Sequence, residues 1–329
     1  TAHYALNLEL FLENANHSFM EVNPVLIKEY KKSTTLRRTK TDSVDCESIA
    51  RWLITVEYKP HSKGFYHAYS LKSLTRLRDR LIRQRSFYLV KITNVLDHTF
   101  PEFKPFFNER LSKTALYLLE NYGSAEKMAR MNSASYDKLR CISRGKFSIQ
   151  QFLRLKELAA NTVGVNNSIF DLELNTLLTL YKSLSDEINT LETEIIKLIE
   201  EVHPHYMSIP GIGPISAAVI YAEYGDISNF SNPGQMLAFA GIEPGINDSG
   251  TESHGGRMVK HGSSQLRYVL LNACLPLIRF DLTFATYYEK KRAEGKKHRV
   301  AITHVAKKLI RVIYALERQD VDFNAQKLR

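Results

Sequence analysis

Two carboxylates near the N-terminus have a spacing that suits metal chemistry. In the segment "KTDSVDCESIA", Asp42 and Asp45 stand three residues apart, so both side chains lie on one face of a helix. Two oxygen donors one turn apart are the kind of ligands that Mg²⁺ or Mn²⁺ takes at phosphoryl-transfer sites. The helix dipole alone also favours acidic residues in a first turn. The spacing by itself therefore leaves a purely structural role open.

A serine in a turn-rich segment near the C-terminus is a candidate nucleophile. Ser249 follows Asp248 in "NDSGTESHGGRMVKHGSSQLRYVLLNA", where the chain has to turn sharply. Such a serine needs an activating base or metal, and in most turns it only shapes the backbone. The cations that follow can hold phosphates or form an ordinary solvated surface. They are Arg257, Lys260 and Arg267.

Two glycines open a helix in the stretch "SIPGIGPISAAVIYAEYGD", residues 208–226. Gly211 and Gly213 are predicted to allow positive φ and to leave backbone N–H groups uncovered, and Pro214 suits the first helical position. The pattern is typical of a helix-hairpin-helix, which holds a DNA phosphate on its amides whatever the base. A closely packed turn between helices is the structural alternative.

Residues 69 to about 205 are predicted to form long helices, of which the first is unusually basic. Asp79 is its single acidic residue before residue 91, and the pattern fits a solvated face as well as a nucleic-acid contact. Its cations are Lys72, Arg76, Arg78, Arg80, Arg83, Arg85 and Lys91.

A later helix has an apolar seam of coiled-coil type, which predicts either dimerisation or packing within one chain. The seam residues are Leu177, Tyr181, Leu184, Ile188, Leu191, Ile195, Leu198 and Val202.

The N-terminal 68 residues are predicted to be α/β. "HSFMEV" alternates like a strand, and "VLIKEYKK" reads as a short helix. A second helix follows, with Thr39 or Thr41 as its cap and Ile49, Leu53 and Ile54 as its apolar face.

Composition points to an anionic partner. The 329 residues include 45 Lys and Arg against 35 Asp and Glu, a net charge of +10, and nucleic acid is the commonest partner of so basic a chain. Cys46, Cys141 and Cys274 have neither metal spacing nor a disulfide framework, which indicates a reducing compartment. The longest apolar run is too short to span a membrane, so no membrane association is expected.

Several segments together resemble one group of transposases. In the C-terminal part they are "SIPGIGPISAAVIYAEYGDISNF", "GIEPGINDSGTESHGGRMVKHGSSQLRYVLLNA" and "YYEKKRAEGKKHRVAITHVAKKLI". Upstream, "EVNPVLIKEY" and "RRTKTDSVDCESIARWL" resemble the second half of that group's RuvC-like domain. The chain is thereby identified, by resemblance, as a member of the DEDD insertion-sequence transposases of the IS one-ten and IS eleven-eleven group, related to the Piv DNA invertase.

The resemblance implies a fold in three parts, α/β followed by all-α. Residues 1–68 would be part of a RuvC-like (RNase H-like) domain, and residues 69–205 basic helices and a coiled coil. Residues 206–329 would be a helical transposase domain that contains the helix-hairpin-helix.

The resemblance also implies an RNA-guided DNA recombinase. Asp42 and Asp45 match the last two of four acidic residues around Mg²⁺ or Mn²⁺, and Ser249 matches a serine that attacks DNA. The implied partners are donor and target DNA, an element-encoded guide (bridge) RNA, and further copies in a dimer or tetramer, in the bacterial cytoplasm near the nucleoid. The implied nucleic-acid contacts are Arg76, Arg78, Arg80, Arg83, Arg85, Gly211, Gly213, Arg257, Lys260 and Arg267.

The chain departs from this pattern at its start. "TAHY" at Thr1–Tyr4 resembles a stretch that follows the first two acids, so both acids would fall before Thr1. A truncated, catalytically inactive nucleic-acid-binding derivative is therefore the alternative prediction.

Overall fold

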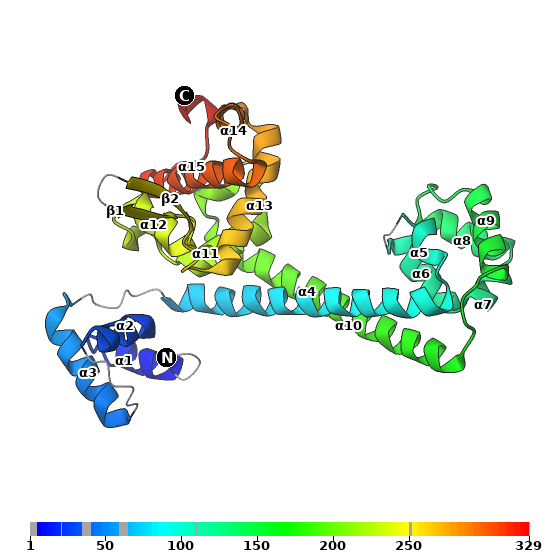
Figure 1. Cartoon of the computed structure of the whole chain (residues 1–329), viewed down its shortest axis with the longest axis horizontal. Coiled ribbons are helices and arrows are strands. Elements are labelled where there is room, and N and C mark those ends of the chain that lie inside the picture. The colour runs from blue at the N-terminus through cyan, green and yellow to red at the C-terminus, as the bar shows by residue number, and fades with distance from the viewer. Residues whose placement is uncertain are drawn as a thin grey trace.

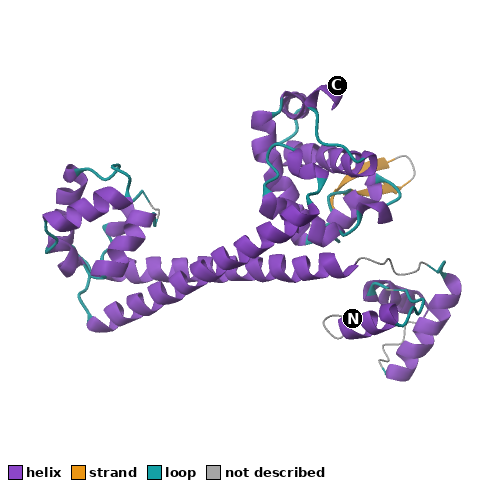
Figure 2. Cartoon of the chain, turned by 180° about the vertical axis from the view of Figure 1, so that it is seen from behind, coloured by secondary structure: helices purple, strands orange, loops and turns teal. Residues whose placement is uncertain are grey.

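The computed structural model describes residues 5–20, 22–34, 41–58, 65–108, 111–249 and 252–328. At positions 65–67, 245–249, 252–257 and 327–328 it describes the backbone alone. Most of the described chain is helical, and the strands in it form one hairpin (Figure 2). That hairpin pairs β1 (Pro244–Ser249) with β2 (Glu252–Met258).

Two long helices form the spine of the molecule. α4 (Phe65–Thr99) and α10 (Ser168–Val202) pack against each other and connect two compact helical units (Figure 1). Leu71 near the start of α4 belongs to the core of the C-terminal unit, whereas Ile92 near its end belongs to the core of the other unit. Each long helix therefore contributes to two separate hydrophobic cores.

The middle unit is built between the two long helices. Four of its helices are preceded by a Ser or Asn residue that acts as the N-cap. The side chain of each cap accepts a hydrogen bond from a first-turn N–H. Phe103, Leu118, Met128 and Leu155 fill its core, and Leu174 of α10 closes it. The helices are α5 (Phe103–Phe106), α6 (Lys113–Tyr122), α7 (Ala125–Ala129), α8 (Ser133–Ile142) and α9 (Ile149–Ala160).

The C-terminal unit packs its helices around α11 and α15. α11 buries small side chains such as Ala217, Ala218 and Ala222, which let neighbouring helices approach closely, and α15 buries one face along its length. The elements are η2 (His205–Ser208), α11 (Pro214–Tyr224), η3 (Ile227–Asn229), α12 (Pro233–Ala240), the hairpin, α13 (Ser264–Phe280), α14 (Leu282–Ala293), α15 (His298–Gln319) and η4 (Ala325–Leu328).

The predicted α/β domain at residues 1–68 is wrong. The described part of this region forms the helices α1 (Ala5–Asn14), α2 (Pro24–Thr34) and α3 (Asp42–Thr55), with no strand and no RNase H-like sheet. Residues 17–20 and 22, in the predicted strand, have no regular structure, and residue 21 lies outside the described residues. A strand persists only when a neighbouring strand takes up its backbone hydrogen bonds, and the described region contains none. Thr1–Tyr4 also lie outside the described residues.

The prediction of a cap for α3 is confirmed, but its apolar face is open. The Thr41 hydroxyl accepts a hydrogen bond from the Val44 amide at 3.4 Å, as an N-cap does. Ile49, Leu53 and Ile54 form the predicted face, and all three are exposed. Periodicity correctly predicted the helix. The apolar face, however, is not covered by any other part of the described chain.

The predicted apolar seam of α10 packs within the chain. Ile188 and Ile195 are buried, Leu191 packs against the C-terminal core, and α10 lies along α4 over much of its length. This arrangement is one of the two alternatives that the seam left open. Assembly of several copies through the same seam stays a prediction.

No single helix of the described chain is long and apolar enough to cross a membrane. By length and composition α13 and α14 pass this test together, but the pair is bent by 106° at the break between them.

Candidate nucleic-acid interface and the predicted catalytic residues

Two of the predicted nucleic-acid contacts on α4 are held by carboxylates of neighbouring helices. Arg76 donates from Nε and Nη2 to the two carboxylate oxygens of Glu223 on α11, at 2.8 and 3.1 Å. Arg78 donates from Nε and Nη2 to Glu192 Oε1 on α10, at 2.7 and 2.5 Å. Arg76 therefore links α4 to α11 and Arg78 links α4 to α10, contacts that a spacing pattern on α4 alone does not reveal.

The remaining arginines of the predicted contact set on α4 are held less firmly by carboxylates. Arg80 is exposed and Arg85 is half-buried, and neither forms an ion pair with any residue that the structure describes. Arg83 pairs with Asp79 at 2.8 Å, yet 71% of its side chain remains exposed. A surface pair of this kind contributes about 0.3–0.5 kcal/mol, so Arg83 can leave Asp79 for a stronger anion.

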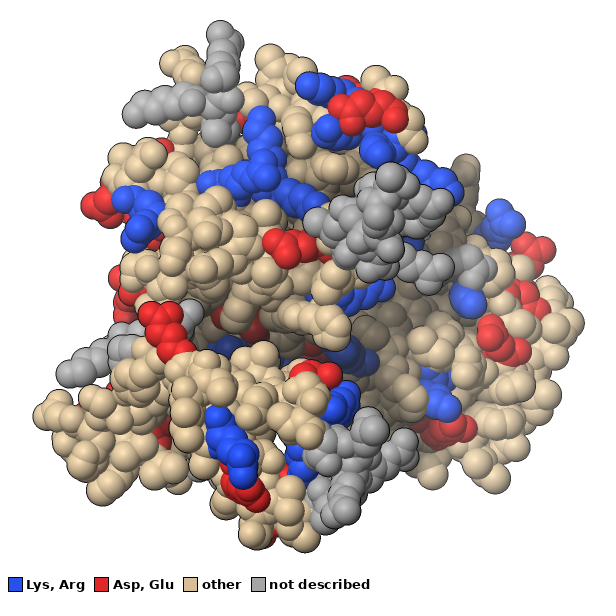
Figure 3. All heavy atoms as spheres, turned by 60° about the vertical axis from the view of Figure 1, so that its left-hand side comes forward, with Lys and Arg blue, Asp and Glu red and all other residues tan. Residues whose placement is uncertain are grey.

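A groove of about 910 Å³ lies between the first half of α4 and the start of α13. One wall carries four cations and the other is made of small and polar residues. The groove is lined by Tyr69, Lys72, Ser73, Arg76, Asp79, Arg80, Arg83, Gly262, Ser263, Ser264 and Gln265. In Figure 3 Lys and Arg side chains gather over the upper part of the molecule and recur in the hollow beneath it.

Close backbone contacts fix the start of α13. A Cβ at Gly262 would lie 2.2 Å from the carbonyl oxygen of Phe239, so only glycine fits against the end of α12. The Ser263 amide donates to the same carbonyl at 3.2 Å, and the Ser263 hydroxyl accepts from the Leu266 amide at 3.2 Å. The first turn of α13 is therefore held rigidly at the edge of the groove, with Ser264 exposed.

Gln265 joins the two walls of the groove. Its Nε2 donates to Asp79 Oδ2 at 3.1 Å, and Asp79 in turn pairs with Arg83. Its Oε1 is buried without a partner among the described residues, and a buried acceptor left unpaired costs about 1–3 kcal/mol. Gln265 thus positions the carboxylate of Asp79 with its Nε2, while its own Oε1 has no partner among the described residues.

Glu223 is the buried carboxylate that organises this region. Burial raises the pKa of its carboxyl, but the hydrogen bond from Arg76, the positive charges of Lys72 and Arg76, and a hydrogen bond with Ser263 outweigh burial, so the pKa lies below its ordinary value. Its side chain is 1% exposed. Glu223 therefore stays ionised and links α4, α11 and the cap of α13. Sequence reasoning missed it, although it is the single acid in an otherwise apolar helix.

Gly211 and Gly213, the two glycines just before α11, have different roles. Gly211 has φ +98°, and a Cβ there would lie 2.9 Å from Pro276 Cγ and 3.0 Å from the Ala273 carbonyl oxygen on α13. Gly213 is the N-cap of α11 with φ −81°, which any residue adopts, and open space lies in front of it. The expectation of positive φ is confirmed for Gly211 and wrong for Gly213. Gly211 faces a packed helix, which leaves Gly213 as the more open of the two.

The predicted serine lies at the end of the hairpin. Ser249 is the last residue of β1 and pairs in register with Glu252, while Asp248 pairs with Ser253. The structure describes only the backbone of Ser249 and Arg257. Lys260 is exposed just beyond the hairpin.

Arg267 has a structural contact. Its Nη1 donates to the carbonyl oxygen of Ala240 at 3.1 Å and so satisfies a carbonyl at the C-terminal end of α12. A Cβ at Gly241 would lie 2.7 Å from the same nitrogen. Half-buried and held in this way, Arg267 braces the junction between α12 and α13.

Asp42 and Asp45 occupy the first turn of α3, as the spacing predicted. Asp42 is exposed, whereas Asp45 accepts a hydrogen bond from Lys31 of α2 at 2.5 Å. Carboxylate oxygens are suitable ligands for Mg²⁺ or Mn²⁺, so the pair fits part of a metal site. Among the described residues no group of three or more acidic, His or Cys side chains is placed to complete it.

The structure does not bring the acids and the serine together. α3 and the hairpin lie in separate parts of the molecule in both views (Figures 1 and 2). It does bring the basic face of α4 to the start of α13, a juxtaposition that sequence spacing could not predict.

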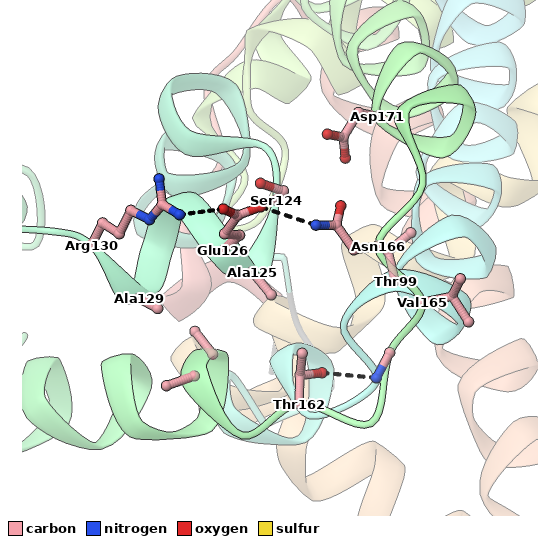
Figure 4. A pocket seen from close by; sticks show the side chains of 13 residues that line it. Thr99, Ser124, Ala125, Glu126, Ala129, Arg130, Thr162, Val165, Asn166 and Asp171 are labelled. Atoms are coloured by element: carbon pink, nitrogen blue, oxygen red, sulfur yellow. Dashed lines mark hydrogen bonds and ion pairs between the residues drawn. The ribbon is translucent and has the colours of Figure 1, made fainter.

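A second pocket, of about 280 Å³, lies in the middle unit near the end of α9 and the start of α10 (Figure 4). Glu126 at its rim accepts from Arg130 at 2.5 Å and from Asn166 at 3.0 Å. Asp171 lines it from α10. Because Glu126 is already paired on both sides, the pocket has no set of free ligands pointing to a particular chemistry.

Two family models match this chain, and both describe transposases. One, a DEDD transposase model of the IS110 type, matches residues 1–101, and the other, "Transposase IS116/IS110/IS902 family", matches residues 204–289. The matches define the class as an insertion-sequence transposase with a DEDD N-terminal domain.

The chain belongs to the IS110/IS116/IS902 family of transposases. It is 27% identical over 245 residues to the insertion element IS110 uncharacterized 43.6 kDa protein of Streptomyces coelicolor, covering 72% of this chain and 60% of that protein. It is 25% identical over 260 residues to the transposase for insertion sequence element IS1111A of Coxiella burnetii, covering 78% and 59%. It is also 27% identical over 149 residues to the pilin gene-inverting protein of Moraxella bovis, covering 43% and 46%.

The chain thus spans about 60% of the length of the IS110 and IS1111A proteins that it matches. The matched ranges contain every predicted catalytic residue. Asp42 and Asp45 fall within the first, and Ser249 falls within the second.

Proposed function

We propose that this chain acts as an RNA-guided DNA transposase, in which a metal site that includes Asp42 and Asp45 works together with Ser249 as the nucleophile. The substrates are donor and target DNA, and an element-encoded bridge RNA guides their choice. One observation carries the proposal. One family match contains Asp42 and Asp45, and the other contains Ser249.

The serine step conserves the energy of the phosphodiester bond. Ser249 Oγ forms a bond to phosphorus while the bond from phosphorus to one deoxyribose oxygen breaks, and the proton lost by the serine is balanced by the proton that the leaving oxygen takes up. A DNA hydroxyl then displaces the serine and restores a DNA phosphodiester. Ser249 is the last residue of β1 and pairs with Glu252 of β2, so its backbone lies at the end of the hairpin.

Asp42 and Asp45 would hold a divalent cation, which when bound supplies positive charge next to the scissile phosphate. In the described structure Lys31 is paired with Asp45 Oδ1, so the lysine competes with a cation for that oxygen. The pair also needs further ligands beyond the two on α3, because Mg²⁺ prefers octahedral coordination.

The positions of the two halves support assembly of several copies. Asp42 and Asp45 lie on α3, apart from the hairpin that carries Ser249 (Figure 1). We propose that the two halves meet between subunits of a dimer or tetramer, which places acids from one copy beside the serine of another.

The test uses the complete protein with its guide RNA and both DNAs. Ser249→Ala removes the attacking oxygen, so recombination should fall by about 10³-fold or more and the covalent adduct seen on denaturing gels should disappear. Ser253→Ala on the opposite strand of the same hairpin is the matched control and should keep both. Recombination by Ser249→Ala, or the absence of any adduct from the wild type, would reject the serine mechanism. Nucleic-acid binding without any recombination would favour the non-catalytic alternative.

A further inference from the structure

We propose that the groove between α4 and the first turn of α13 binds the sugar-phosphate backbone of a nucleic acid, with Arg80 and Arg83 as its cations and the exposed start of α13 as its hydrogen-bond donor. This inference rests on the proposed action on nucleic acids. It assigns the contact to a particular groove and divides the α4 arginines into two groups with different roles.

The charge of the groove fits an anionic polymer. Lys72, Arg76, Arg80 and Arg83 line it against the single carboxylate of Asp79, and an open volume of about 910 Å³ is large enough for more than one phosphate group. The four cations recur at spacings of three or four along α4, so they share one face of that helix. A row of cations beside an open groove follows a phosphate chain better than it fits a single small anion.

The start of α13 adds donors to the opposite wall. The Ser264 amide, at the first helical position, has no acceptor within the helix, and Ser264 is one of the residues that line the groove. The close fit of Gly262 against α12 fixes the direction in which this turn points. Backbone N–H groups at the positive end of a helix are good ligands for phosphate oxygens, and here that end of α13 lines the same groove as the cations of α4.

The two groups of arginines are distinguished by their partners. Arg76 and Arg78 each donate two hydrogen bonds to a carboxylate of another helix, so they hold the fold together. Arg80 has no ion-pair partner in the described part of the chain, and Arg83 has one weak surface pair. The phosphate contacts therefore fall on Arg80 and Arg83.

The experiment measures binding of the full chain to a fluorescein-labelled DNA duplex and to an RNA duplex of the same sequence, over a series of salt concentrations. Arg80→Ala and Arg83→Ala should each weaken binding by roughly 3- to 10-fold and reduce the slope of log K against log salt by about 1, the loss expected for one phosphate contact. Arg140→Ala on α8, an exposed arginine of the other unit, is the charge-matched control and should leave both values unchanged.

Ser264 allows a second test of the α13 wall. Ser264→Ala removes the hydroxyl alone, whereas Ser264→Pro also removes the amide donor, and proline is well tolerated at the first helical position. The proline variant should therefore bind more weakly than the alanine variant, with the helical circular dichroism of both equal to that of the wild type.

The outcomes separate this inference from the proposed function. Wild-type affinity and salt slope in an Arg80→Ala/Arg83→Ala double variant, an equal loss in Arg140→Ala, or no binding by the wild type at low salt would each overturn the groove. Loss on DNA or on RNA supports it and identifies the polymer. Failure of the serine mechanism shows instead as a missing covalent adduct while binding through the groove persists.

Discussion

The two ends of the chain differ in how firmly they hold their functional groups. In the C-terminal unit, Glu223 is fixed by contacts from α4 and from the cap of α13, within a core to which α11, α13 and α15 all contribute. In the N-terminal region, α2 and α3 bury no residue among those described, and Asp45 is held by one lysine.

This difference bears on how each part can work. A charged group surrounded by packed helices keeps its position before a ligand arrives, so the groove beside α13 is preorganised for binding. The acids of α3 lie on an open helix whose apolar face has no cover in the described structure. The final geometry of the acids therefore depends on whatever packs against that face.

The largest effect on stability is expected from removing the buried carboxylate. Glu223→Ala removes the carboxylate to which Arg76 donates and which lies 3.9 Å from Lys72 Nζ, and breaking a buried pair in this way should lower the free energy of unfolding by about 3–5 kcal/mol. Thermal unfolding followed by circular dichroism measures the loss. Glu192, the partner of Arg78, is more exposed than Glu223. Glu192→Ala should therefore lower the free energy of unfolding by clearly less. Equal losses in the two variants would contradict the central role of Glu223.

The packing of the turn at Gly211, between η2 and α11, against α13 gives the next largest effect. Gly211→Ala combines positive φ with a clash against Pro276 and Ala273, and together these should destabilise the protein by about 2–4 kcal/mol. Gly295→Ala is the matched control, because Gly295 also has positive φ but no atom lies within 4 Å of its added Cβ. Its cost should stay near the backbone strain of about 1–2 kcal/mol. If the two variants lose equal stability, the close contact with α13 contributes nothing.

A smaller, local effect should depend on pH. The hydrogen bonds to Asp322 and Asp320 raise the pKa of His205 above its ordinary value of 6.5, and the nearby carboxylate of Glu317 adds to this. The stability that these hydrogen bonds give to the folded state through the charged imidazole is fully present below pH 6.5. It is lost as the pH rises through the raised pKa of His205. Limited proteolysis of the segment after α15 should therefore become faster with rising pH in that range. His205→Gln should remove the pH dependence, and a wild-type rate independent of pH would contradict the prediction.

The smallest effect is expected at the acidic pair itself. Lys31→Ala breaks a partly exposed ion pair with Asp45, so the free energy of unfolding should change by only about 0–1 kcal/mol. Because the same change frees a carboxylate, Mg²⁺ or Mn²⁺ should bind more tightly, which isothermal titration can measure. Asp45→Asn should abolish the gain. Strong destabilisation by Lys31→Ala would mean that the N-terminal helices are as firmly packed as the C-terminal unit.

Local features and family membership could be predicted from the order of the amino acids alone. Thr41 was identified as a possible cap from its residue type, and the first turn of α3 follows from it because capping involves neighbours only a few positions apart. The apolar spacing along α10 predicted a helix with a packing seam for the same reason. The long order of motifs that resembles the transposases was likewise readable along the chain, and the family matches confirm it.

The role of each cation, and the choice of the segments that form strands, depend on contacts between distant parts of the folded chain. Arg76, Arg78 and Arg80 look alike along α4, and their different roles come from carboxylates more than a hundred residues away in sequence. The alternating segment at residues 17–22 predicted a strand wrongly, because a strand depends on a partner that local sequence does not supply. The groove beside α13 arises in the same way, from residues that meet only when separate helices pack. Local hydrogen bonds follow from sequence, whereas long-range electrostatic contacts exist only once the chain has folded.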